Sequence, residues 1–137
     1  MKQFYADLGG QSRPFRYKLS DRIEIENRFG CGLMELIRDK VFPTDPHGKF
    51  LGGGMLSVQI ALLWVGLRHA NPRRVTEAAI TEWLSAIIEA DGSVFAPINE
   101  AMRAVFASGV LGKAVDISDD EPDESKVQAE TDPPQGS

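Results

Sequence analysis

The stretch Met55–Leu67 is apolar on almost every side, and it constrains the fold more than any other part of the sequence. Only Ser57, Gln59 and Gly66 interrupt it. A helix of this kind belongs in the centre of a bundle or at an interface, because one apolar face would not need so many apolar residues. We therefore expect a central helix. A body this small has few other elements to cover such a helix, which favours a partner at any exposed part.

Hydrophobic periodicity predicts further helices around this central one. The predicted segments are Asp21–Phe29, a short helix from Leu33 to about Val41, Val75–Ala90 and Pro97–Ser108. Ser20 is expected to cap the first and Gly30 to end it, and both Thr76 and Ile88 are expected on the apolar, buried stripe of Val75–Ala90. Arg13–Leu19 alternates loosely, as a half-buried strand would, but it is short, and an extended lead-in to the first helix is the alternative. The predicted fold is all-α, a small bundle of about five helices with room for one short N-terminal strand.

Residues 42–54 separate two of the predicted helices and are rich in proline and glycine, which predicts a loop. Gly52–Gly54 suggest a phosphate cradle, but such a loop requires Gly-Lys-Ser/Thr after a strand, and Met55-Leu56-Ser57 follows here. A flexible hinge or a lead-in to the next helix is therefore favoured.

Charge divides the chain into two parts. Residues 1–113 carry a net charge of +2 and residues 114–137 carry −7, which together give the −5 of the whole chain. The second part has few large apolar residues and several prolines, so it cannot bury enough surface to offset its ordering entropy. We expect a helical domain over 1–113 and a disordered acidic tail over 114–137. The tail either solvates the protein, or occupies a basic surface on a partner or on the body itself.

Several classes of protein are disfavoured. No apolar run reaches the ~18 residues of a membrane helix and no signal peptide is evident, so a cytoplasmic protein is expected. A pI near 5.0 argues against nucleic-acid binding. One cysteine and two histidines leave little for a metal site.

An enzyme is also disfavoured. Cys31 with His47 or His69 would be the one nucleophile pair available, but a small side chain packed at a helix corner is the favoured interpretation. Trp64 and Trp83 are expected to anchor the core. Glu24, Glu26 and Glu35 are expected on solvent-exposed helix faces.

A resemblance adds to this interpretation. It rests on Arg13-Pro14-Phe15-Arg16, the segment Ile23–Gly32 with Leu36 after it, the apolar helix ending Val65-Gly66-Leu67, Thr76 and Leu84, and the segment Ala101–Gly112. This order resembles the family of tail assembly chaperone-like proteins of tailed phages and gene transfer agents, some members of which are labelled tail tube proteins. The Pro/Gly loop 42–54 and the very apolar helix after it depart from the family pattern.

The resemblance implies a non-enzymatic assembly factor without a cofactor. Chaperones of this type bind the tape measure protein, a long helical chain that sets tail length, and the tail tube protein is a second candidate partner. Apolar positions on the central helix are the expected partner-binding residues, namely Leu56, Ile60, Leu63 and Trp64. Self-association through that face is a further expectation. The alternative is a structural tail component, a tube or connector subunit that stays in the particle, and a strand-rich sequence is expected for a tube.

Overall fold

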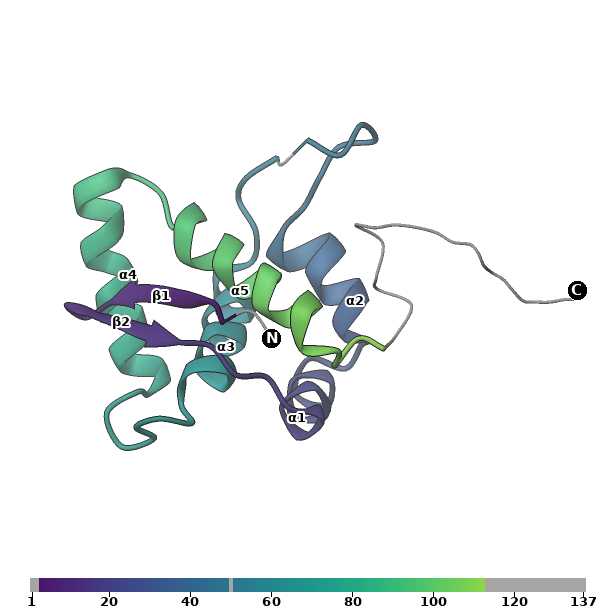
Figure 1. Ribbon diagram of the computed structural model, residues 1–137. Helices are drawn as coiled ribbons and strands as arrows, with labels where there is room; N and C mark the ends of the chain where they lie inside the picture. Colours follow the sequence, from purple (N-terminus) through teal and green to yellow (C-terminus); the bar gives the residue numbers. More distant parts are fainter. Residues whose placement is uncertain (1–2, 50, 113–137) are drawn as a thin grey trace, which may run out of the picture.

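The structure, a computed structural model, describes residues 3–49 and 51–112 and is mainly helical (Figure 1). Its elements are the strands β1 (Tyr5–Leu8) and β2 (Gln11–Pro14), the helices α1 (Leu19–Phe29) and α2 (Leu33–Leu36), the π-helical turn η1 (Ile37–Val41), and the helices α3 (Leu56–Leu67), α4 (Glu77–Asp91) and α5 (Phe95–Ser108). The predicted fold class, a small helical bundle with a short N-terminal strand element, is confirmed. The acidic segment 114–137 lies outside the described residues.

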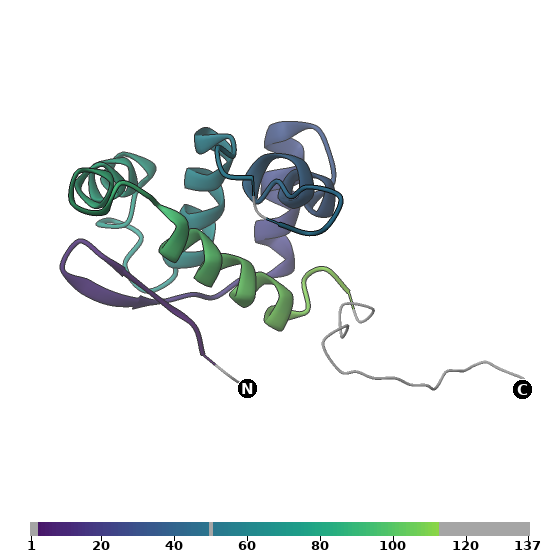
Figure 2. The ribbon, with the colours of Figure 1, turned by 90° about the horizontal axis from the view of Figure 1, so that it is seen from above.

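Helix α3 is the central helix that the sequence predicts. It packs against α1, α4, α5 and η1, and Figure 2 shows it between α4 on one side and α1 on the other, with α5 crossing in front. Eight of its residues are buried: Val58, Gln59, Ala61, Leu62, Leu63, Val65, Gly66 and Leu67. The small domain therefore encloses more of this helix than the sequence led us to expect.

The N-terminal strands form an antiparallel hairpin in which Leu8 pairs with Gln11. Gly9 and Gly10 make the turn, with φ of 62° and 77°, values that the two-residue turns of hairpins require. Of the segment Arg13–Leu19, only Arg13 and Pro14 belong to a strand, β2, and residues 15–18 form the extended lead-in to α1 that was the other expectation. After β2 the Phe15 amide donates to the Phe4 carbonyl over 2.9 Å, and the Arg16 amide then donates to the Gly66 carbonyl of α3 over 2.8 Å.

The start of α1 also differs from the prediction. The helix begins at Leu19, and the Asp21 carboxylate accepts a hydrogen bond from the Lys18 amide over 2.9 Å. Ser20 is therefore inside the helix and does not cap it. The predicted end at Gly30 is confirmed.

Two residues near the later helix starts have roles other than those expected. Thr76 is the N-cap of α4, and its hydroxyl accepts from the Ala79 amide over 3.1 Å, so it is not on the apolar stripe. Pro97 lies inside the first turn of α5, which begins at Phe95. Proline is tolerated there because the first-turn amides have no partner within the helix.

Glu26 holds the corner between α1 and α2, where a plain solvent-exposed position was expected. Its Oε2 accepts from the Leu33 amide over 2.7 Å and from Arg22 Nε over 2.9 Å. The Leu33 amide first, and then Arg22, lower the pKa of this carboxyl. The ionised carboxylate therefore stabilises the start of α2.

We expect Glu26→Ala to lower the free energy of unfolding by about 1 kcal/mol near neutral pH, as the loss of a helix cap does. Because the folded-state pKa is lowered, the stabilisation is present above the pKa of the unfolded chain and is lost as pH falls through the folded-state value. The difference between wild type and variant should therefore shrink in acid. Urea unfolding at neutral and at acidic pH measures it, and an equal difference at both would contradict the cap.

Candidate partner-binding surface

The structure separates the four predicted partner-binding residues. Leu56, at the start of α3, has 43% of its surface exposed, whereas Leu63 is fully enclosed in the core. Ile60 and Trp64 are half-buried and pack against the core cluster. The four residues therefore do not form one exposed face.

Trp64 is covered on one face by a cation. The Arg68 guanidinium lies 4.4 Å from the ring centroid and is held in place by ion pairs to Asp21 and Glu24 over 2.9 and 2.6 Å. These ion pairs dock the end of α3 on α1. Trp64 thus serves mainly as the core anchor that the sequence predicts.

Leu56 instead contributes to an apolar groove at the other end of α3. The groove encloses about 310 Å³ and lies between the glycine-rich end of the loop 42–54, the start of α3 and the corner between α4 and α5. Buried Gln59 and Ile98 line it together with Leu56, Ile88 and Phe95. The last three are each 43% exposed, so large apolar side chains of the groove face solvent.

The loop 42–54 is tied to the body where it forms one wall of this groove. The Met55 amide donates to the Lys40 carbonyl over 2.6 Å, and the side-chain amide of Gln59 donates to the Val41 carbonyl over 2.9 Å. A side chain at Gly54 has no room, because its Cβ would lie 2.6 Å from the Lys40 oxygen. The end of the loop is thus a lead-in fixed to α3, one of the two roles favoured from the sequence.

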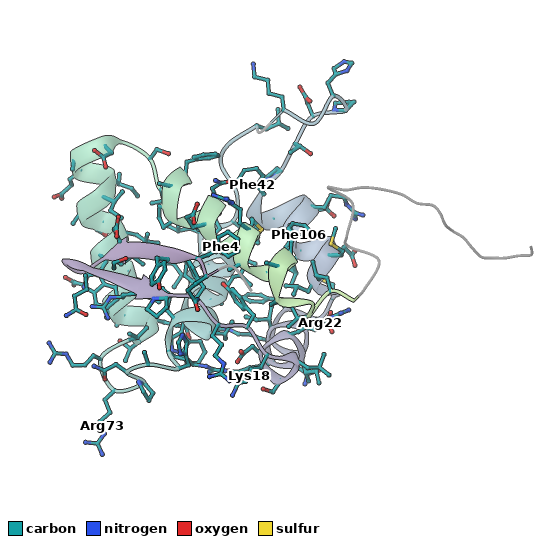
Figure 3. All side chains as sticks on the ribbon, viewed as in Figure 1. Phe4, Lys18, Arg22, Phe42, Arg73 and Phe106 are labelled. Atoms are coloured by element: carbon teal, nitrogen blue, oxygen red, sulfur yellow. The ribbon has the colours of Figure 1, made fainter. Side chains whose placement is uncertain are left out.

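The opposite wall comes from the turn between α4 and α5. The Phe95 amide donates to the Ser93 hydroxyl over 3.0 Å, and the ring of Phe95 lies 5.7 Å from that of Phe42, which is at the base of the loop (Figure 3). This ring pair joins the two walls. Leu51 and Met55, next to the lining residues in the chain, are also exposed and extend the apolar surface.

Electrostatics give the groove its chemical character. Among the described residues that line it, none carries a formal charge. Its polar groups are backbone groups, the Ser93 hydroxyl and the Gln59 amide, both of which already make hydrogen bonds. Such a surface suits apolar side chains of a partner and offers nothing to hold an ionic ligand.

Ile88 and Phe95 are the lining residues that sequence reasoning missed. Ile88 was expected on the buried stripe of its helix, and Phe95 was not singled out. The available sequence signal was that the apolar stripe of Val75–Ala90 continues almost to the turn at Gly92. The groove brings these two residues together with Leu56 alone of the four predicted ones.

No catalytic or metal site is evident in residues 3–49 and 51–112. Cys31 is half-buried at the corner between α1 and α2, and no hydrogen bond joins it to either histidine within this part of the chain. The His69 Nε2 atom is instead hydrogen-bonded to the Pro14 carbonyl oxygen, at a distance of 2.8 Å. No group of His, Cys, Asp or Glu in the described part is arranged to hold a metal ion. None of the described helices combines the length and apolar character needed to cross a bilayer.

Comparisons of the chain with protein-family profiles, curated proteins and solved structures give no match.

Proposed function

We propose that this protein is a non-enzymatic tail assembly chaperone that binds the tape measure protein and keeps it soluble in the host cytoplasm until the tail tube assembles. The proposal combines the sequence resemblance with one structural observation. That observation is the uncharged groove with Leu56, Ile88 and Phe95 exposed around it.

The groove suits a helical client because of how helices present their side chains. Residues at spacings of three and four lie on one face of a helix, and an apolar groove takes up two or three of them as anchors. A volume of about 310 Å³ accommodates such anchors without enclosing a whole helix. The client's remaining faces would stay free for the tube subunits that later surround it.

The alternative, a structural tube or connector subunit, has less support. A tube subunit is expected to contribute an extensive sheet, and the part of the chain described here contains one two-stranded hairpin. A connector subunit remains compatible with a helical fold. The exposed apolar groove favours the chaperone, because a subunit built for permanent contact would need a larger interface than this groove provides.

Co-expression tests the proposal. The tape measure protein is produced alone and together with this chain, and its soluble fraction is measured after centrifugation. We expect most of it to sediment when it is produced alone and to stay in solution, in complex, when the chain is present. An unchanged soluble fraction would contradict the chaperone function.

A further inference from the structure

A second cavity lies at the other end of α5 from the groove. It encloses about 570 Å³ between the N-terminal segment, the connection from β2 to α1, the turn after α3 and the last turns of α5. Phe4 and Phe15 supply apolar surface, while Arg16, Lys18 and His69 supply cationic or protonatable groups. No carboxylate belongs to the described residues that line it, so this cavity, unlike the groove, is basic.

The positive charge of this cavity is not neutralised within the described body. No ion pair joins Arg16 or Lys18 to a described carboxylate. The nearby carboxylates of Asp21 and Glu24 are both held by Arg68. Figure 3 shows Lys18 beside α1 and Phe4 near β1, and both residues line the cavity.

The chain itself carries a complementary segment a few residues further along the sequence. Ser108 lines the cavity, and the described chain continues to Gly112. Two aliphatic residues, Val115 and Ile117, then precede a dense acidic cluster, Asp119, Asp120, Glu121, Asp123 and Glu124. Ser108 is only four residues before Gly112, and an extended residue spans at most about 3.6 Å. The aliphatic pair and the acidic cluster are therefore both close enough in the sequence to reach the cavity.

We propose that the segment 115–124 docks in this cavity of its own chain. Val115 and Ile117 would contact the apolar wall, and the acidic side chains would neutralise Arg16 and Lys18. Attachment to α5 makes this contact favourable even if it is weak, because a short covalent connection holds the segment at an effective concentration on the order of 1 mM. A separate acidic partner at micromolar concentration would have to displace it.

Amide chemical shifts of the full-length chain test the proposal. The spectra of wild type, Arg16→Gln/Lys18→Gln and Arg73→Gln/Arg74→Gln are compared at about 0.02 M salt. Both pairs remove the same charge from exposed side chains, but only the first pair lines the cavity. We expect the resonances of 115–124 to shift in the first double variant and to stay at the wild-type positions in the second.

Salt and dilution complete the test. About 0.5 M salt should move the wild-type resonances to those of the Arg16→Gln/Lys18→Gln variant, because the Debye length falls to about 4 Å. Tenfold dilution should change nothing. Equal shifts in both double variants, no shift in either, or shifts that depend on protein concentration would overturn the proposal, the last because it would place the segment on another copy. None of these outcomes depends on whether the chain binds the tape measure protein.

Discussion

Gly66→Ala is expected to destabilise the protein by about 2 kcal/mol, although alanine is the better helix former by ~1 kcal/mol. Gly66 lies on α3 against the Tyr17 ring, and an added Cβ would lie 2.5 Å from the Tyr17 hydroxyl oxygen and 2.8 Å from a ring carbon. The ring has little room to move, because its hydroxyl donates to the Leu62 carbonyl over 2.8 Å. Overpacking therefore exceeds the gain in helix propensity.

The surroundings of Tyr17 strengthen this expectation. Burial, with the nearby charge of Asp21 as a second cause, raises the pKa of the Tyr17 hydroxyl well above its usual value, so the group stays neutral and hydrogen-bonded. Thermal unfolding should show a loss of roughly 10 °C in Tm for a domain of this size. In a Tyr17→Leu background, where the ring is absent, Gly66→Ala should cost little or become stabilising. A loss of the same size in both backgrounds would contradict the steric account.

Leu56→Asp is expected to abolish capture of the tape measure protein while leaving the fold intact. The side chain is exposed at the groove, so in the complex the new carboxylate would be buried against apolar groups without a partner. In the free protein the substitution is tolerated, since residue 56 begins α3 and an acidic group is favourable at a helix N-terminus. We expect at least a tenfold fall in co-purified client, or about 1.4 kcal/mol of binding free energy.

Leu19→Asp is the matched control. Leu19 also begins a helix, is 61% exposed and lies outside the groove. This variant should capture the client as well as wild type does. Equal loss in both variants would assign the effect to surface charge in general and would remove the groove as the binding site. Leu63→Asp cannot serve as a test, because it would place a carboxylate in the fully enclosed core.

The helices were predictable because their signals are local. The apolar run Met55–Leu67 predicts α3 to within one residue, and Gly30 ends α1 as expected, while Gly92 and Gly109 are the C-caps of α4 and α5. The hairpin was missed although Gly9-Gly10 is a two-residue turn signal, because its strands have only four residues each and the loose alternation of apolar residues lies in the longer segment that follows. The starts of α1 and α4 differ from the predicted ones because the side chains of Asp21 and Thr76 accept hydrogen bonds from backbone amides at these helix starts.

The groove was only partly predictable, because it depends on which parts of each helix the others cover. Helical spacing places Leu56, Ile60 and Trp64 along one stripe of α3, yet the packing leaves Leu56 exposed and half-buries the other two, with Arg68 over the Trp64 ring. Leu63 points to the core, which no pattern of apolar residues on an all-apolar helix can reveal. Ile88 and Phe95 join the groove through the fold of the turn at Gly92, a contact between segments far from Leu56 in the sequence.

Site-specific photo-crosslinking of the complex tests the central claim most directly. Benzoylphenylalanine is placed at position 95, where it replaces an aromatic residue of the groove, or at position 5, where it replaces Tyr5, an aromatic residue of similar exposure on β1. We expect irradiation to join position 95 to tape measure residues that recur at spacings of three and four, and position 5 to give little product. A complex that forms but crosslinks from position 5 and not from position 95 would contradict binding in the groove.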